Sequence, residues 1–124
     1  MSMILVADDD RDILDLVVFK LSAAGHELIT ATDGATALTE ARRAVPDLVV
    51  LDVAMPGMSG LDVCRELRAD PITSAIPVIL LTARAQEPDV EAGYNVGATD
   101  YIVKPFSPRE LQSRVTALLS RATA

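Results

Sequence analysis

Acidic side chains stand directly after two short apolar runs of this sequence. Asp8 and Asp9 follow the run Met3–Ala7, and Asp52 follows the run Leu48–Leu51. If these runs are neighbouring parallel strands, the carboxylates converge at one edge of a sheet, where open α/β sheets bind ligands. Two such charges about 4 Å apart repel by roughly 4 kcal/mol at an effective dielectric near 20, and a bound cation would offset this. Oxygen ligands suit Mg²⁺, Ca²⁺ or Mn²⁺, and Mg²⁺ is favoured where a few carboxylates combine with waters and a phosphate.

Two further polar residues follow apolar runs later in the chain. Thr82 comes after Val78–Leu81, and Lys104 comes after Tyr101–Val103. A hydroxyl and an ammonium group suit the oxygens of a phosphoryl group. The edge would then offer carboxylates for a metal, a nucleophile and two anion ligands, which are the groups that phosphoryl transfer needs. A single Asp after a strand is usually a helix N-cap, as we expect for Asp10. The prediction therefore rests on the fact that suitable polar residues follow four of the predicted strands together.

The apolar runs alternate with helical patterns along the chain. A fifth run covers residues 28–31, and apart from Thr30 the five runs are apolar continuously rather than at alternate positions. Continuous apolar runs are typical of strands buried on both faces, as in a parallel sheet. Five such strand–helix units predict an α/β domain whose sheet is covered by helices on both faces.

The segments between the runs have apolar residues at helical spacing, which predicts five helices, each with a buried stripe. The first four stripes are Leu14, Val17, Val18 and Leu21; Ala37, Leu38, Ala41 and Val45, ended by Pro46; Leu61, Cys64 and Leu67, after an N-cap at Ser59; and a faint one within Asp89–Val96. The last helix has Leu111, Val115, Leu118 and Leu119 on its buried face, and a capping box that begins at Ser107 opens it.

The composition favours one acidic domain over residues 1–124. Half of the 124 residues are hydrophobic, enough for one core, and the formal net charge is −7. A chain this acidic is repelled by the negative charges of nucleic acid and of anionic membranes. No apolar run approaches the length of a membrane span, and the single cysteine, Cys64, allows no intrachain disulfide. We therefore expect a cytoplasmic protein that binds neither membranes nor nucleic acid directly.

The motifs resemble those of the receiver domains of two-component response regulators over nearly the full length of the chain. The matching segments are Ile4–Asp10, Leu51–Gly60, Leu81–Ala83 and Gly97–Phe106. The resemblance implies a doubly wound, flavodoxin-like fold with five helices and a five-stranded parallel sheet of strand order 2-1-3-4-5. It also implies a phosphorylation-activated signalling switch rather than a conventional enzyme. Such a switch catalyses only its own phosphorylation and dephosphorylation.

The resemblance assigns a role to each matching position of the site. Asp52 is similar to the phosphoacceptor, and Asp8, Asp9, Asp52 and the backbone carbonyl of Ala54 are similar to the ligands of Mg²⁺. Thr82 and Lys104 resemble the groups that hold the phosphoryl oxygens. Thr82 and Tyr101 also resemble the two switch residues of the family, a hydroxyl that moves toward the phosphoryl group and an aromatic ring that turns inward with it.

Two further properties follow from the resemblance. The Lys104–Pro105 bond is expected to be cis, as is frequent in this family. Positions 54 and 84 are expected to tune the access of water to the phosphoryl group, so that substitution of Arg84 changes the rate of dephosphorylation.

The implied partners are a histidine kinase or phosphotransfer protein and a downstream output protein or domain. The signal would be read on the face built from the fourth helix, the fifth strand and the fifth helix. Asp100, Glu110, Arg114 and Arg121 could form charge pairs across a dimer of this face, but Val90 and Asn95 stand where further charges would be expected. We therefore expect a monomer that forms at most a weak dimer after phosphorylation.

Two other functions are compatible with this fold class. One is a small flavin-binding protein, which the few aromatic residues and the lack of a Ser/Thr-rich loop after the first strand disfavour. The other is a degenerate receiver that acts only as a binding module. The presence of all of Asp9, Asp52, Thr82 and Lys104 disfavours it.

Overall fold

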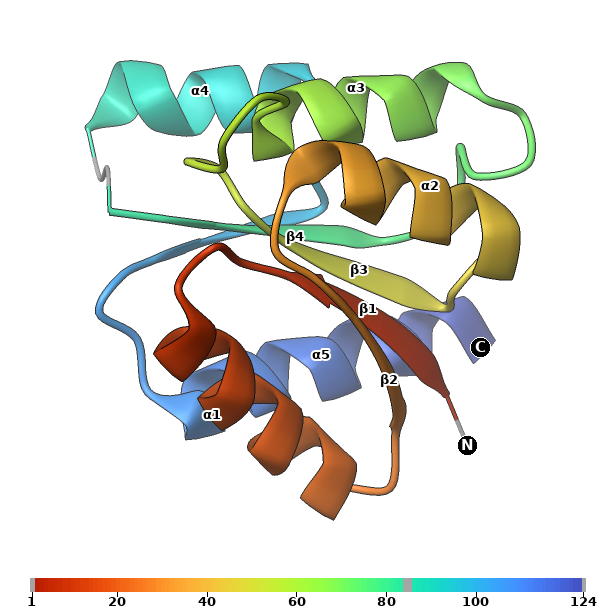
Figure 1. The fold of residues 1–124 in the computed structure, drawn as a ribbon, viewed down its shortest axis with the longest axis vertical. Coiled ribbons are helices and arrows are strands. Elements are labelled where there is room, and N and C mark those ends of the chain that lie inside the picture. Colours follow the sequence, from red (N-terminus) through yellow and green to blue (C-terminus); the bar gives the residue numbers. More distant parts are fainter. Residues whose placement is uncertain (1, 84–85, 124) are drawn as a thin grey trace.

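A computed structural model describes residues 2–83 and 86–123 of the chain. Strands and helices alternate along these residues (Figure 1). The strands are β1 (Met3–Ala7), β2 (Glu27–Ala31), β3 (Leu48–Asp52), β4 (Val78–Thr82) and β5 (Asp100–Val103). The helices are α1 (Arg11–Ala23), α2 (Gly34–Ala44), α3 (Gly60–Ala69), α4 (Glu87–Asn95) and α5 (Pro108–Thr123).

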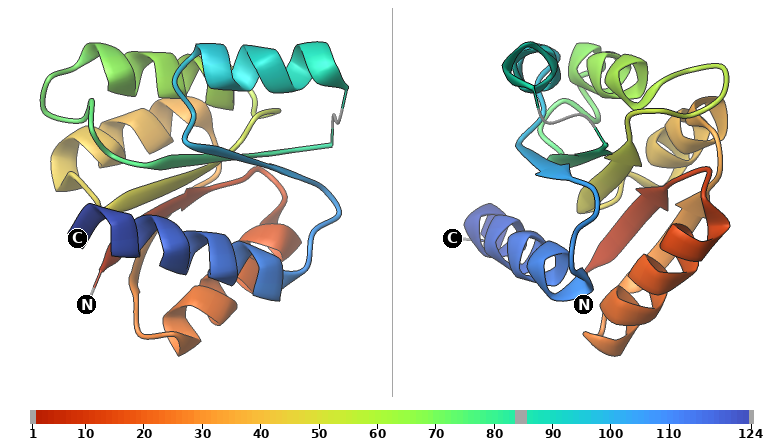
Figure 2. Two further views of the ribbon diagram at one scale, coloured as in Figure 1. Left: turned by 180° about the vertical axis from the view of Figure 1, so that it is seen from behind. Right: turned by 90° about the vertical axis from the view of Figure 1, so that its left-hand side faces the viewer.

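The five strands form one parallel sheet in the order β2-β1-β3-β4-β5. Helices α1 and α5 cover one face of the sheet, and α2, α3 and α4 cover the other (Figures 1 and 2). This is the strand order that the resemblance implies, so the predicted doubly wound fold is confirmed. In such a sheet the carboxyl ends of all strands lie at the same edge, and the loops that follow them share that edge.

The core consists of two apolar layers, one on each face of the sheet. Every residue of β3 and β4 is buried, which explains why both strands read as continuous apolar runs. One layer joins alternate strand residues to α2 and α3, and the other joins the remaining strand residues to α1 and α5. Cys64 is fully buried in the first layer, as its place on an apolar stripe predicts.

Three predicted helix caps are present. The side chain of Asp10 accepts hydrogen bonds from the backbone amides of Asp12 and Ile13 at the start of α1. Ser59 caps α3 in a capping box with Asp62, and Ser107 Oγ accepts from the backbone amide at position 110. These caps fix where each helix begins after its loop.

Two helix ends differ from the sequence-based prediction. Val45 does not continue the buried stripe of α2: it is the C-cap, with φ 45° and ψ 65°, and its side chain is 43% exposed. Pro46 disfavours a helical conformation at the residue before it, so the helix ends there. Helix α4 runs from Glu87 to Asn95, rather than over Asp89–Val96, and begins without a side-chain cap.

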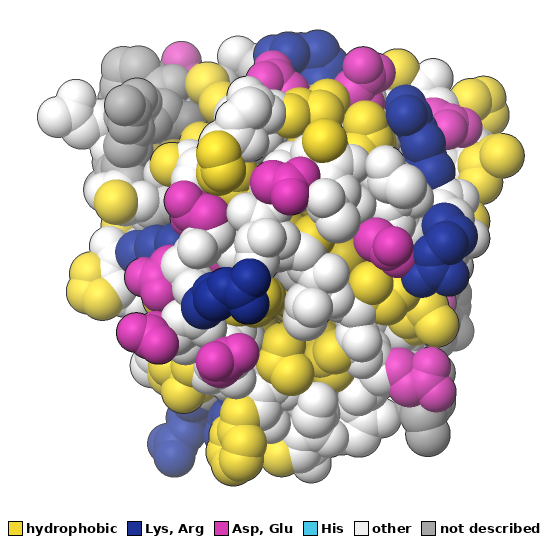
Figure 3. Space-filling model, in the orientation of Figure 1, with side chains coloured by type: hydrophobic (Ala, Val, Ile, Leu, Met, Phe, Trp, Pro, Cys, Tyr) yellow, Lys and Arg dark blue, Asp and Glu magenta, His cyan; other side chains and the backbone are white. Residues whose placement is uncertain are grey.

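The surface in Figure 3 is mixed in charge. Several acidic side chains lie at its left, where α1 begins and β4 ends in Figure 1. Among the described residues, no helix combines the length and apolar character that crossing a membrane requires.

Candidate functional site

The three predicted metal-binding carboxylates meet at the carboxyl edge of the sheet. Asp8 and Asp9 follow β1, Asp52 ends β3, and β1 pairs with β3. One carboxylate oxygen from each residue lies within 4.8 Å of the other two. Asp8 is fully buried and Asp52 is 4% exposed, whereas Asp9 is exposed. A cation could therefore approach the two buried carboxylates from the side of the exposed Asp9.

Lys104 lies between the two buried carboxylates. Its Nζ donates a hydrogen bond of 3.0 Å to Asp8 Oδ2 and lies 3.3 Å from Asp52 Oδ1. Burial opposes the charge of this ammonium group, but the hydrogen bond to Asp8 and the charge of Asp52 outweigh it and raise the pKa of Lys104. Lys104 is therefore a permanent cation at the site, and it partly neutralises the two carboxylates.

The Asp52 carboxyl is harder to ionise than an ordinary aspartate. Its burial raises its pKa from 3.8 to about 6, and the charge of Asp8 adds to this rise while Lys104 opposes it. The carboxyl is still mostly ionised at neutral pH, so it is available as a nucleophile. A cation brought to the site would attract the carboxylate and so favour its ionised form further.

Backbone hydrogen bonds between neighbouring strands position these side chains. The Asp8 amide donates to the carbonyl of Ala31 at the end of β2, and Asp8 Oδ1 accepts from the amide of Asp10 at 2.9 Å. On the other side, the Lys104 amide donates to the Thr82 carbonyl at 2.6 Å. The side chains of the site are thus carried by the ends of the strands and not by long loops.

Gly60 is a site residue that the sequence reasoning missed. A Cβ at this position would collide with the backbone carbonyl of Asp52, and the Gly60 amide donates to the Val53 carbonyl at 3.0 Å. The N-terminus of α3 can therefore approach the end of β3 only if residue 60 lacks a side chain. The glycine after Ser59 was visible in the sequence, but only the fold shows which backbone it touches.

The donor set fits a hard divalent cation. All three ligating groups are carboxylates, and Mg²⁺ binds through oxygen with one or two carboxylates and several waters. Ala54 is exposed two residues after Asp52, and no hydrogen bond among the described residues uses its carbonyl oxygen. Residues 8, 9, 52 and 54 thus fit the predicted magnesium site.

Thr82 and Tyr101 lie on the two strands at the far side of Asp52. Thr82 is 4% exposed and ends β4, next to β3, and it lies opposite Val103 of β5. Tyr101 is half-buried on β5, and its ring centroid is 6.3 Å from that of Tyr94 on α4. The pair therefore connects the neighbourhood of Asp52 to the α4 side of the sheet.

An apolar cleft of about 340 Å³ adjoins Lys104. Ile13 and Leu16 of α1 line one side, and Pro105 and Phe106 line the other. The Lys104–Pro105 peptide bond is cis, as the resemblance implies. Position 84, the other residue expected to tune water access, lies outside the described residues.

Comparisons with known proteins agree with this fold. The sequence pattern of the response regulator receiver domain matches residues 4–116. The DNA-binding response regulator MtrA of Mycobacterium tuberculosis is 48% identical over 118 residues, which are 95% of this chain and 50% of that protein. The chain thus spans about half the length of the curated relatives it matches.

Two solved structures illustrate the structural likeness. The chemotaxis response regulator CheY4 of Vibrio cholerae has a TM-score of 0.90 at 34% identity, over 95% of this chain and 98% of that one. The receiver domain of the sensor histidine kinase PA1611 of Pseudomonas aeruginosa has a TM-score of 0.89 at 29% identity, over 96% and 98%. Its structure contains a magnesium ion coordinated in the active-site cleft. The present chain belongs to the response regulator receiver domains, which receive phosphorylation-based signals from histidine kinases in two-component systems.

Proposed function

We propose that Asp52 is the phosphoacceptor of a Mg²⁺-dependent signalling switch. The observation that carries this proposal is the position of the Asp52 carboxylate, buried at a sheet edge between Asp8 and the ammonium of Lys104. Burying an ionised carboxylate there lowers the stability of the fold, and a site that binds charged groups explains why the carboxylate is present. A phosphoryl group and a divalent cation together supply charges that match these residues.

The residues suited to hold Mg²⁺ are Asp8, Asp9, Asp52 and the carbonyl of Ala54. Bound Mg²⁺ supplies charge neutralisation and orientation of the phosphoryl oxygens. The exposed position of Asp9 allows direct coordination, whereas the hydrogen bonds that Asp8 makes with Lys104 and the Asp10 amide suit a ligand that acts through water. The magnesium ion in the PA1611 receiver domain supports this proposal.

Phosphoryl transfer forms one bond and breaks one. An Asp52 oxygen attacks the phosphorus of a phosphohistidine, the P–O bond forms, and the P–N bond breaks with its electron pair going to the histidine nitrogen. Lys104 Nζ, already beside Asp52, holds a phosphoryl oxygen, and the Thr82 hydroxyl holds a second. The donor would be a histidine kinase or a phosphotransfer protein. Hydrolysis later returns the carboxylate, and the small side chain of Ala54 leaves water a path to the phosphorus.

The phosphorylated state would be read on the face formed by α4, β5 and α5. Thr82 and Tyr101 support this proposal because they lie on adjacent strands between Asp52 and α4. A change in the hydrogen bonding of Thr82 would be passed to Tyr101 and so to the surface beside Tyr94. An output protein or domain would bind there. Relatives such as MtrA are DNA-binding regulators, yet the acidity of this chain still predicts no direct contact with nucleic acid.

Incubation with acetyl phosphate tests the proposal. Intact-mass analysis should show one added phosphoryl group when Mg²⁺ is present and none in excess chelator. Asp9→Asn should lose most of the labelling, because it weakens the metal site without touching the nucleophile. The matched variant Asp15→Asn removes an equal charge from an exposed position of α1 and should label normally. Equal labelling of all samples, or none in any of them, would contradict the proposal, and the second result would favour a receiver that acts only as a binding module.

A further inference from the structure

Gly93 occupies a helical position that glycine does not favour. It lies within α4 and, unlike Gly25, Gly57 and Gly97, it does not have a positive φ. Glycine is the least favourable residue inside a helix after proline, because it loses the most conformational freedom on folding. Helix α4 also begins without a side-chain cap, so a glycine weakens a helix that already lacks local support. The reason for the glycine must therefore lie in what packs against it.

The ring of Tyr101 packs directly on the backbone of α4 at Gly93. A Cβ added at residue 93 would lie 2.8 Å from Tyr101 Cδ2, 2.9 Å from Tyr101 Cε2 and 3.2 Å from Leu80 Cδ1. Carbon atoms in ordinary contact are about 3.5–4.0 Å apart. Gly93 is buried, and α4 lies on β5 (Figure 2). The edge of the tyrosine ring thus fills the space that a side chain at residue 93 would need.

The neighbours of Gly93 differ in how freely they can move. Leu80 is fully buried in the core layer on this face of the sheet. The C-terminal end of α4 is tied to α3, because Arg68 Nε donates a hydrogen bond of 2.9 Å to the Gly97 carbonyl. Tyr101, by contrast, is only half-buried. A side chain at residue 93 would therefore push the Tyr101 ring toward solvent, and would leave Leu80 and the end of α4 in place.

We propose that Gly93 is a positioning residue for the switch: it leaves the space between Leu80 and α4 that the Tyr101 ring occupies in its inward position. This proposal rests on the proposed function, in which Thr82 and Tyr101 carry the effect of phosphorylation from Asp52 to the α4–β5–α5 face. Tyr101 stands opposite Leu80 on the strand that Thr82 ends. With alanine at residue 93, Asp52 still accepts the phosphoryl group, but the ring turns inward less often and α4 receives less of the signal.

The position of the ring can be observed directly, because Tyr94 and Tyr101 are the two tyrosines of the chain. Isotope-labelled tyrosine gives ring NMR signals for these two residues, and Tyr94→Phe identifies those of Tyr101. The phosphoryl mimic beryllofluoride with Mg²⁺ should move the Tyr101 signals of the wild-type chain. In Gly93→Ala they should already differ in the free protein, and their movement with the mimic should shrink by about twofold or more.

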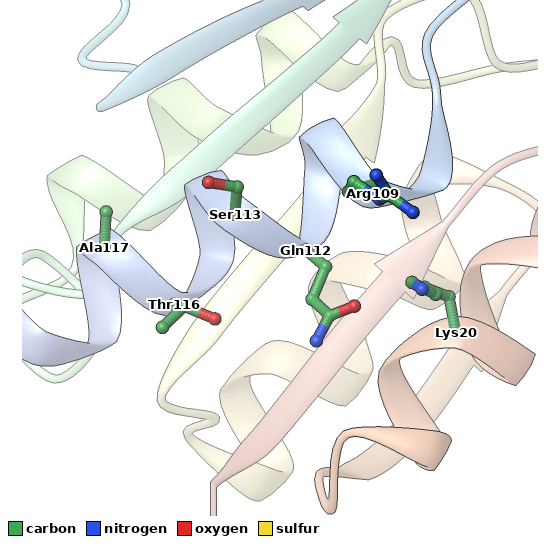
Figure 4. A pocket seen from close by; sticks show the side chains of 6 residues that line it. All are labelled: Lys20, Arg109, Gln112, Ser113, Thr116 and Ala117. Atoms are coloured by element: carbon green, nitrogen blue, oxygen red, sulfur yellow. The ribbon is translucent and has the colours of Figure 1, made fainter.

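Two further alanine variants serve as controls. Asn95→Ala changes an exposed residue of α4, and Ser113→Ala changes an exposed residue of α5. Figure 4 shows Ser113 among the residues that line a depression between α1 and α5, on the opposite face of the sheet from α4. Both variants should keep the wild-type Tyr101 signals and their full movement. If Asn95→Ala changes them as much as Gly93→Ala does, the effect belongs to α4 in general and the proposal is wrong.

Thermal melts test the contact between Gly93 and Tyr101 without any phosphorylation. In a Tyr101→Ala background the space is empty, so Gly93→Ala should raise the melting temperature by about 3–6 °C, because alanine favours the helix. In the wild-type chain the collision with the ring should cancel or reverse that gain. Tyr101→Phe keeps the ring and should behave as wild type does. The same rise in all three backgrounds would overturn the proposal.

Mass analysis after acetyl phosphate treatment separates failure of this proposal from failure of the proposed function. Without labelling of wild-type Asp52 the proposed function is wrong, while the melts still show whether Gly93 makes room for the ring. The expected result is that Gly93→Ala labels at Asp52 and its Tyr101 ring moves less than that of wild type. Labelling of both proteins, with Tyr101 signals that start at the same position and move equally far, would show that Gly93 does not position the switch.

Discussion

Asp52 makes the stability of the metal-free protein depend on pH. Its carboxyl has a pKa of about 6 in the folded chain and an ordinary value of 3.8 when exposed. Between these values the folded state binds more protons than the unfolded state, so this group's contribution to stability falls as the pH rises from about 4 to about 6. Above pH 6 the ionised, buried carboxylate lowers the free energy of unfolding by up to about 3 kcal/mol.

Asp52→Asn should therefore stabilise the metal-free protein. At pH 7 we expect a gain of about 1–3 kcal/mol in the free energy of unfolding, and little or none below pH 4. Urea titrations at several pH values measure this difference. Asp15→Asn, exposed on α1, serves as the matched control and should stay within about 0.5 kcal/mol of wild type. If Asp52→Asn were less stable than wild type at pH 7, burial of the Asp52 charge beside Asp8 would not be destabilising.

Magnesium should stabilise the fold through the same carboxylates. At a concentration about tenfold above Kd, binding to the folded state alone adds about 1.4 kcal/mol. Thermal melts with and without Mg²⁺ measure this, and Asp52→Asn should lose much of the shift. Unchanged melting of wild type in Mg²⁺ would contradict the assignment of Asp8, Asp9 and Asp52 as a metal site.

The positions of the strand-end residues could be read from the sequence, and the side chains they contact could not. Asp8, Asp9 and Asp52 could be brought together because each follows an apolar run and parallel strands end at one edge. The contact of Lys104 with both Asp8 and Asp52 depends on the conformation of a long side chain, which no pattern encodes. Gly60 was missed because its role depends on an approach of α3 to β3 that only the packed fold defines.

Among the elements, the helices with capping signals were predicted best. Ser59 and Ser107 mark their helix starts within a residue, because the cap is a local interaction. Helix α4 has no such cap and no strong stripe, so its predicted bounds were wrong by one or two residues. Val45 was assigned to the buried face of α2 because it lies four residues after Ala41 and is apolar. The effect of Pro46 on the residue before it outweighs that spacing.

Val45 carries backbone strain that substitution should relieve. A β-branched residue in the left-handed region is unfavourable, and the exposed side chain contributes little packing. Val45→Gly should raise the free energy of unfolding by about 0.5–1 kcal/mol. This figure is the strain relieved minus the cost of the extra conformational entropy that glycine gives the unfolded chain. Val45→Ala keeps the Cβ and should not gain. If thermal melts rank the alanine variant above the glycine variant, the left-handed cap of α2 is wrong.

At the scale of the whole molecule, charge pairs that could have joined two copies are already formed within one chain. Arg114 contacts both carboxylate oxygens of Asp100, at 2.7 and 2.8 Å, and reaches Glu110 at 3.4 Å. The pair with Asp100 contributes to the raised pKa of Arg114, first through its hydrogen bond and then through its charge. These side chains would have to exchange partners to build a dimer, and exposed pairs contribute only about 0.2–1 kcal/mol each.

We therefore expect a monomer before phosphorylation and at most a weak dimer afterwards. Sedimentation velocity with and without beryllofluoride and Mg²⁺ measures the change. Arg114→Gln should destabilise the link between β5 and α5 without raising the tendency to dimerise. A tight dimer in the absence of the phosphoryl mimic would refute this view of the α4–β5–α5 face.

Asp52 carries the one carboxylate that we propose receives the phosphoryl group. Acyl phosphates are reduced by borohydride, which converts the modified aspartate into homoserine and leaves free aspartates unchanged. After treatment with acetyl phosphate and Mg²⁺, peptide mass analysis should find homoserine at position 52 and aspartate at positions 8 and 9. Homoserine at either of those positions, or at any aspartate of an Asp52→Asn protein that labels at the wild-type level, would contradict the account.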